Sequence, residues 1–182
     1  AHLHCYDISR FYEIYGCYIP TIEKNFKIIV TYSIGDSSAI GDSNLSSIKI
    51  PNRGMDVGAK FCAVKFLIDN NVNFERVLFL HSKSNVKRRK EYFDSLLAKI
   101  NDDTLSAFPD ILWEMKGDKV RSLDGEYDGN WLPERNATYR DELSLYLSGR
   151  ATGDAVFAEG NVYLLARQAC EALFTNQIVY NC

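Results

Sequence analysis

Short apolar runs alternate with amphipathic stretches through the first hundred residues. The apolar runs are typical of buried strands, and they span residues 2–6, 26–33, 47–51 and 76–80. The stretches between them repeat their apolar side chains at helical spacing, and they span residues 8–25, 52–71 and 86–100. This alternation predicts an α/β fold, with a mixed, mostly parallel sheet flanked by helices.

The second half of the chain has a less regular pattern. Its expected elements are a strand at 110–115, a hairpin within 116–136, a helix at 137–149 and a helix at 167–174. The run 155–166 is typical of one strand interrupted by Glu159, Gly160 and Asn161. Because no repeat or linker divides the chain, we expect one compact domain over residues 1–182.

Composition narrows the class of protein. The formal net charge of -3 argues against a duplex nucleic-acid binder, so we expect no nucleic-acid partner. No apolar run reaches 18 residues, which predicts no transmembrane helix. The five cysteines form no CxxC pair, which favours a reducing, cytoplasmic location. The chain begins without Met, so we expect a monomer or a fragment of a larger multidomain chain.

The strand expected at 76–80 ends abruptly in polar side chains. His81, Ser82 and Lys83 follow it directly, and in a parallel sheet such a position opens into the ligand-binding edge. The strand expected at 26–33 likewise ends in polar side chains, those of Thr31, Tyr32 and Ser33. An imidazole, hydroxyls and an ammonium could bind a phosphate or a metal, whereas the simplest alternative is a solvated turn.

The segment 51–60 offers a second group of polar side chains. Arg53 could hold a phosphate through its planar fork, and Asp56 could bind a ribose or a base. The structural alternative is that Asp56 caps the helix and Arg53 lies on the surface. The segment matches neither a Walker loop nor a Gly-x-Gly-x-x-Gly fingerprint.

Two further sets of charges have less specific patterns. Residues 87–90 form a basic run at a helix start, where it opposes the helix dipole and could face an anion, although such runs are usually solvated. Carboxylates that could act as a general base lie in the second half, at Asp124, Glu126, Asp128, Asp154 and Glu159.

Two motifs together resemble a known family. "NRGMDVGAKF" at 52–61, followed by "VLFLHSKSN" at 77–85, resembles the rhamnan-synthesis F glycosyltransferases of bacterial polysaccharide pathways. The chain is also similar to the N-terminal glycosyltransferase domain of a multidomain protein of the large chlorella viruses, which would place it in the host cytoplasm. The resemblance covers most of the chain, and it implies a GT-A fold.

The resemblance also implies an activity. It implies sugar transfer from a nucleoside-diphosphate sugar, UDP-sugars being favoured, to a glycan or polysaccharide acceptor. Residues 1–101 would form the nucleotide-sugar half and 102–182 the acceptor half. The donor would be bound by Thr31, Tyr32, Ser33, Arg53, Asp56, Lys60, His81, Ser82 and Lys83. The catalytic base would come from Asp128, Asp154 or Glu159, with Asp154 or Glu159 lying across the cleft from His81.

GT-A enzymes generally carry an Asp-x-Asp motif that holds a divalent metal, often manganese. This chain has no Asp-x-Asp, and His81-Ser82-Lys83 occupies the corresponding place. His81 could therefore ligate Mn²⁺, or Lys83 could supply part of its charge. Two other functions stay open, namely a sugar- or nucleotide-binding module without catalysis and a small phosphotransfer or nucleotide-modifying enzyme.

Overall fold

The chain folds into two units. The computed structural model describes residues 1–40, 45–52, 55–82, 85–116, 119–122, 128–130, 154–158 and 161–174. One unit comprises Ala1–Phe108 together with Val162–Cys182, and the other comprises Pro109–Asn161. The division thus falls after residue 108, and the chain returns to the first unit at residue 162, whereas the sequence suggested halves that meet at residue 101.

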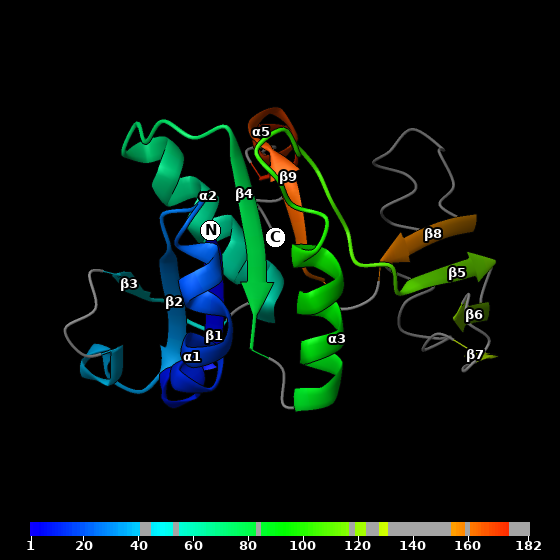
Figure 1. The fold of residues 1–182 in the computed structure, drawn as a ribbon, viewed down its shortest axis with the longest axis horizontal. Helices are drawn as coiled ribbons and strands as arrows, with labels where there is room; N and C mark the ends of the chain where they lie inside the picture. Colours follow the sequence, from blue (N-terminus) through cyan, green and yellow to red (C-terminus); the bar gives the residue numbers. More distant parts are fainter. Residues whose placement is uncertain are drawn as a thin grey trace. The chain divides into compact units, whose positions relative to one another are not determined.

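The first unit is built on a five-stranded sheet in the order β3-β2-β1-β4-β9 (Figure 1). Its strands are β1 (His2–Asp7), β2 (Ile29–Ile34), β3 (Ser46–Lys49), β4 (Arg76–His81) and β9 (Tyr163–Ala166). The first four run parallel, and β9 pairs antiparallel with β4 at the edge. The predicted α/β class with a mostly parallel sheet is therefore confirmed.

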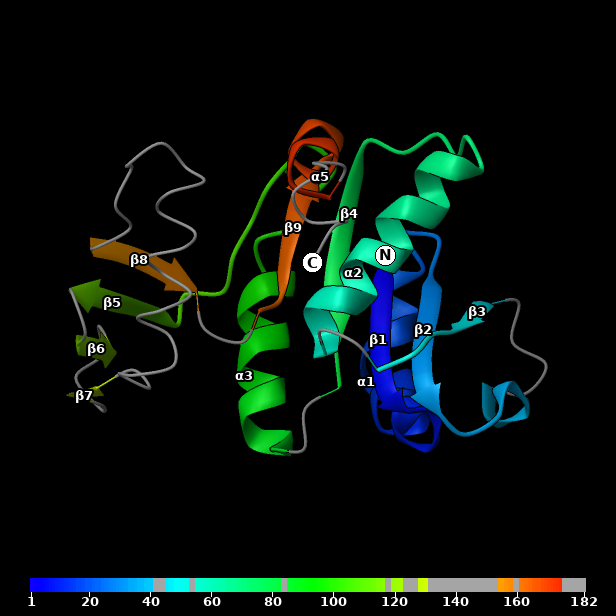
Figure 2. The same ribbon diagram turned by 180° about the vertical axis from the view of Figure 1, so that it is seen from behind.

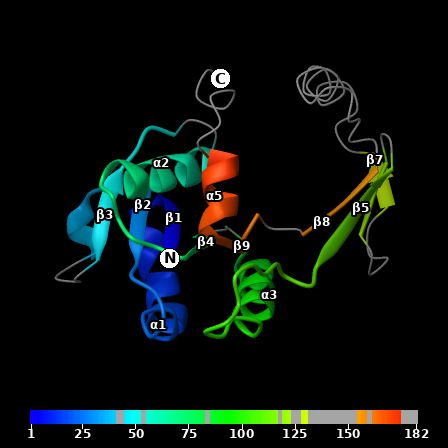
Figure 3. The same cartoon turned by 90° about the horizontal axis from the view of Figure 1, so that it is seen from above.

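Helices cover both faces of this sheet. They are α1 (Phe11–Ile22), α2 (Met55–Asp69), α3 (Val86–Leu97) and α5 (Arg167–Phe174), with 3-10 turns η1 (Ile8–Arg10) and η2 (Ser37–Ile40). Seen from behind, α2 lies in front of the sheet (Figure 2), and the view from above places α2 and α5 on one face and α1 and α3 on the other (Figure 3). No helix in the described part of the chain is long and apolar enough to cross a membrane.

The core beneath α2 contains both apolar and polar buried side chains. Buried side chains of α2, β4, β9 and α5 form the apolar part, namely Val64, Leu67, Val77, Phe79, Leu165 and Cys170. Toward the carboxyl ends of β1, β2 and β4, the buried positions are His4, Thr31 and His81. Because apolar burial is the main stabilising term, polar residues here need a separate explanation.

The apolar spacing within 52–71 predicts a buried stripe of Val57, Phe61, Val64, Leu67 and Ile68, and helix α2 is rotated relative to that stripe. Val57, expected in the core, is 44% exposed, and the buried positions are Ala59, Lys60, Ala63, Val64 and Leu67. Lys60 thus occupies a place in the buried stripe that an apolar residue would normally take. Asp56 lies in the first turn of α2 because the helix begins at Met55, so the prediction that Asp56 caps the helix is wrong.

The rotation lowers the expected cost of truncating Phe61. This side chain is only half-buried and packs on the edge of the core cluster. Phe61→Ala should therefore destabilise the chain by about 1–2 kcal/mol, less than the ~3–5 kcal/mol of a fully buried ring. Urea unfolding measures this difference, and a loss above that range would mean that the ring is as buried as the sequence pattern suggests.

The second unit contains a four-stranded antiparallel sheet in the order β7-β6-β5-β8. Its strands are β5 (Leu112–Lys116), β6 (Lys119–Ser122), β7 (Asp128–Asn130) and β8 (Asp154–Ala158). A hairpin within 116–136 is confirmed by the antiparallel pairing of β6 with β7. The single strand expected at 155–166 is wrong, because β8 pairs in this sheet while β9 pairs with β4. The helix expected at 137–149 lies outside the described residues.

Candidate functional site

The strand order of the first unit defines one point at which a ligand site is expected. From β1 the chain builds β2 and β3 outward on one side, and it then crosses to place β4 on the other side of β1. The order therefore reverses between β1 and β4. In open α/β sheets, ligands bind beyond the carboxyl ends of the strands at such a switch point.

Two histidines lie side by side at this point. In the parallel pairing of β1 with β4, His4 lies opposite His81, and in the pairing of β1 with β2 it lies opposite Thr31. Residues paired in this way project from the same face of the sheet, so the three side chains form one row. The backbone continues the pairing, because Ser82 N donates to the carbonyl oxygen of His4 at 2.7 Å.

The first turn of α2 brings a carboxylate to the same row. The Asp56 Oδ2 atom lies 3.7 Å from His81 Nε2, and the two side chains are 21% and 11% exposed. The other ring nitrogen of His81, Nδ1, lies 3.3 Å from the carbonyl oxygen of Ser82. When Nδ1 donates to that carbonyl, the neutral ring keeps its Nε2 lone pair beside Asp56, where it can accept a hydrogen bond or ligate a metal.

Lys60 lies directly beneath Asp56. Its side chain is 0% exposed, and its Nζ is 3.9 Å from the same Asp56 oxygen that faces His81. The ammonium lies over the Tyr163 ring, 4.2 Å from its centroid, and 5.9 Å from the centroid of Phe79. Burial lowers the pKa of Lys60 to about 7, and the Asp56 carboxylate opposes that shift.

His2 lies beside this row, and the Thr31 hydroxyl links it to His4. The Thr31 hydroxyl is 2.8 Å from His2 Nε2 and 3.0 Å from His4 Nδ1. Burial lowers the pKa of both histidines, and the neighbouring His81 adds to the shift of His4. The Nδ1 atom of His2 is buried with no hydrogen-bond partner among the described residues. These histidines are therefore held neutral inside the fold.

The three residues that end β2 do not act as one group. Strand alternation places Thr31 and Ser33 on the α2 face, whereas Tyr32 is buried on the other face with the Lys49 ammonium 6.0 Å from its ring centroid. The Ser33 hydroxyl oxygen is buried and has no hydrogen-bond partner in the described part of the chain. Of the three, Ser33 is thus the one with hydrogen-bonding capacity left for a ligand.

Several predicted site residues are not brought to this row. Arg53, Lys83 and Glu159 lie outside the described residues, so their roles stay predictions. Asp128 begins β7 and Asp154 begins β8, both in the second unit, and their role as a base is likewise a prediction. The structure therefore brings together His81, Asp56 and Lys60 of the predicted set, with Ser33, Thr31 and Ser82 nearby in the paired strands.

Sequence reasoning missed His4 and Tyr163. The signal for His4 was present in "HLHCY", where His2 and His4 put two polar side chains on one face of an otherwise apolar strand. Tyr163 gave no comparable signal. Its position beside Lys60 follows from the antiparallel pairing of β9 with β4, in which Tyr163 lies opposite Phe79.

The basic run of α3 is balanced within the chain. Arg89 is buried and donates to Glu13 of α1 at 3.0 Å, and Arg88 donates to Glu91 at 3.2 Å. Lys87 also faces Glu91, and Lys90 pairs with Asp94. Asn85 caps the helix by accepting a hydrogen bond from the Arg88 backbone. No ligand anion is needed to explain the basic start of this helix.

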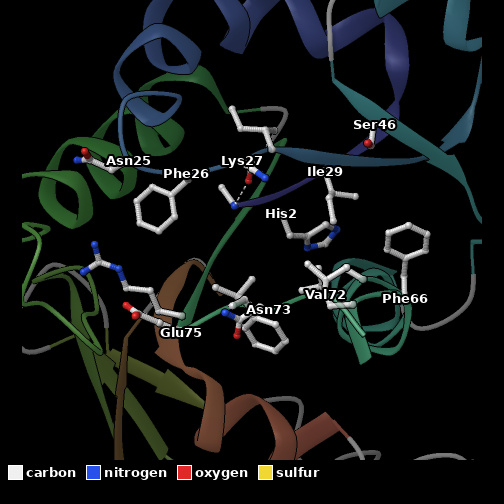
Figure 4. Close-up of a pocket in the computed structure, with 17 residues that line it drawn as sticks. His2, Asn25, Phe26, Lys27, Ile29, Ser46, Phe66, Val72, Asn73 and Glu75 are labelled. Atoms are coloured by element: carbon white, nitrogen blue, oxygen red, sulfur yellow. Dashed lines mark hydrogen bonds between the residues drawn. The ribbon is translucent and has the colours of Figure 1, made fainter. Parts of the chain in front are cut away.

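A pocket lies at the opposite ends of the same strands. It encloses about 540 Å³ and is lined by residues at the amino ends of β1, β2 and β4, including His2, Ile29 and Arg76. Figure 4 shows its rim, with Asn25 and Phe26 on one side and Phe66 and Val72 of the α2 region on the other. Neither Asp56 nor His81 lines it. Because α/β sheets bind ligands at their carboxyl ends, the row with His81 is the candidate site.

Comparison of the chain with protein-family models, with curated proteins and with solved structures gave no match. The geometry of the first unit therefore carries the functional argument.

Proposed function

We propose that the chain is a glycosyltransferase that transfers a sugar from a nucleoside-diphosphate sugar, with UDP-sugars favoured, to a glycan or polysaccharide acceptor. One observation carries this proposal. The polar row of His4 and His81, with Asp56 above it, coincides with the switch point between β1 and β4, where α/β sheets bind nucleotides. The motifs "NRGMDVGAKF" and "VLFLHSKSN" supply Asp56 and His81, the two side chains that meet there.

The chemistry of sugar transfer matches the groups at this edge. The leaving group is a nucleoside diphosphate, so negative charge develops on its oxygens as the glycosidic bond breaks, and nearby donors and cations stabilise that charge. The Ser33 hydroxyl and His81 could bind the donor from the described part of the site. Arg53 and Lys83 would add positive charge, and Asp128, Asp154 or Glu159 would take the proton of the acceptor hydroxyl.

A divalent metal, manganese above all, stays part of the proposal. When bound, it would stabilise the charge of the leaving diphosphate. His81 Nε2 and Asp56 Oδ2, 3.7 Å apart, fit two ligand positions of one ion, one from nitrogen and one from oxygen. Among the described residues, no group of three His, Cys, Asp or Glu side chains could hold a metal. The remaining ligands would come from the diphosphate.

The test is the affinity of the chain for UDP. We expect His81→Ala to weaken UDP binding roughly tenfold or more, since a charged or polar contact at a diphosphate site is typically worth about 1.4 kcal/mol or more. Titration calorimetry with manganese and with a chelator would show whether the loss depends on the metal. Lys90→Ala is the matched control, because Lys90 is an exposed cation paired with Asp94 on α3.

The outcomes separate the proposal from its alternatives. Loss of the metal dependence in His81→Ala would make His81 a metal ligand, whereas an unchanged UDP affinity would make the stretch 81–83 a plain turn. Slow release of UDP from a panel of UDP-sugars would support catalysis. Binding of UDP-sugars without release of UDP would favour a non-catalytic binding module, and binding of free nucleotides regardless of the sugar would favour a nucleotide-modifying enzyme.

A further inference from the structure

We propose that Lys60 is a positioning residue that neutralises Asp56 from below and thereby allows the candidate site to accept an anionic diphosphate. This inference rests on the proposed function and names a role for a residue that cannot touch the ligand. The Lys60 side chain is fully buried, so any influence on a bound nucleotide must pass through another group. Asp56, partly exposed and 3.9 Å from the ammonium, is that group.

The carboxylate of Asp56 and a bound diphosphate are both negatively charged, and the Lys60 ammonium offsets the charge of Asp56. Asp56 carries a carboxylate at the edge where the diphosphate is proposed to bind, and like charges a few Å apart repel strongly at the reduced dielectric of a protein surface. A cation on the buried side of the carboxylate cancels most of that repulsion. The Asp56 Oδ2 atom lies 3.9 Å from Lys60 Nζ and 3.7 Å from His81 Nε2, so a fully buried cation offsets its charge next to the candidate site.

The surroundings of Lys60 hold the ammonium in one place. Its charge lies over the Tyr163 ring at 4.2 Å from the centroid, with Phe79 at 5.9 Å, and ring faces attract cations. Tyr163 comes from β9, Phe79 from β4 and Asp56 from the start of α2, so three elements fix the position of the charge. Because burial lowers the pKa of Lys60 to about 7, a lysine held in this way is a cation beside Asp56 at a pH below that value, and the affinities are measured there.

Stability alone does not account for a lysine at this position. Ala63, Val64 and Leu67 continue the same buried stripe of α2, and taking an ammonium out of water is costly unless it is closely paired. Replacing buried ion pairs by apolar side chains of similar volume is often neutral or stabilising. An apolar side chain would therefore serve the core at least as well, which points to the charge of Lys60 and its place 3.9 Å from Asp56 Oδ2 as the reason for a lysine here.

The experiment is a double-mutant cycle on UDP affinity, measured by titration calorimetry in the presence of a chelator. Lys60→Met keeps the length of the side chain but removes its charge, and should weaken UDP binding about 10- to 100-fold. Asp56→Asn in the same chain removes the repelling carboxylate, so the double variant should recover to within about threefold of wild type. Lys65→Met is the matched control, because Lys65 lies on the same helix, is 55% exposed and pairs with Asp69, and this variant should bind UDP like wild type.

Each outcome decides something different. Recovery in the double variant supports the inference, because a purely structural role of Lys60 would not be reversed by a second change at Asp56. Equal losses in Lys60→Met and in the double variant would overturn it. If wild type binds UDP only with manganese, the cycle is measured with manganese, and if it binds no UDP in either condition, the proposed function fails and the inference with it. Circular dichroism verifies folding, and if Lys60→Met does not fold, Lys60→Gln takes its place in the cycle with the same expected outcomes.

Discussion

Phe79→Ala is expected to destabilise the first unit by about 3–5 kcal/mol, the usual cost of removing a fully buried aromatic ring. Phe79 is 0% exposed and lies on β4, in the interior of the five-stranded sheet. Its ring contacts two other rings, that of His2 with centroids 5.9 Å apart and that of Tyr163 with centroids 5.3 Å apart. Alanine would leave a cavity that neighbours on both β1 and β9 cannot fill without moving.

Urea unfolding followed by far-UV circular dichroism measures this loss. Phe66→Ala is the matched control, because Phe66 lies on α2 and is 37% exposed, and its loss should be about 1 kcal/mol. The same cavity would lie beneath Lys60, whose ammonium is near the Phe79 ring. Equal losses for the two variants would mean that Phe79 is not central to the core.

The strands of the first unit were predictable because each is a short apolar run bounded by polar residues. The structure places β1, β2, β3 and β4 close to the expected ranges. The run at 155–166 shows that an apolar pattern alone does not predict which strands pair. Its apolar residues fit one interrupted strand or two strands equally well, and only long-range pairing decides that β8 joins β5 while β9 joins β4.

The rotation of α2 has a similar cause. A helical stripe is read from apolar residues, so Val57 counted as a core position and Lys60, predicted to bind the donor, did not. In the structure the lysine is buried, because aromatic rings from β4 and β9 and a carboxylate from its own helix surround it. Those partners lie far apart in the sequence, and no local pattern could bring them together.

The candidate site was predictable in part for the same reason. His81 and Ser82 stood out because they end an apolar strand. His4 did not, because its place beside His81 depends on the register between β1 and β4. Thr31, Tyr32 and Ser33 looked like one polar group in the sequence, yet strand alternation separates Tyr32 from the other two.

Acid is expected to destabilise the first unit well above the pH at which its carboxylates titrate. Burial lowers the pKa of His2 well below 6.5 and also lowers that of His4. Below pH 6.5 the unfolded chain therefore binds protons that the folded chain does not, so the free energy of unfolding falls as the pH falls toward the folded pKa values. Each such histidine contributes a slope of up to about 1.4 kcal/mol per pH unit.

The interval from pH 7 to pH 5 covers the titration of the histidines, and Lys60 and the buried amino terminus also change charge in it, because burial lowers their pKa values to about 7 and about 5. The pKa values of Asp7 and Asp36 are lowered by hydrogen bonds from the turns that follow them, so these carboxylates keep their charge throughout the interval. The groups that face the two histidines are His81, Lys60, Asp56 and the amino terminus, and they are common to wild type and to the variant used for comparison, so the difference between the two chains reports the histidine.

That variant is His2→Leu, which removes one of the two buried imidazoles and leaves His4 hydrogen-bonded to Thr31. Urea unfolding at pH 7, 6 and 5 should show a clearly smaller loss of stability for His2→Leu than for wild type, because the variant lacks the suppressed protonation of His2. His2 is fully buried and faces the ring of Phe79, so leucine can occupy the space. An unfolding free energy that is equal at pH 7 and pH 5 in wild type would show that these histidines accept protons freely, and that the polar row is open to water.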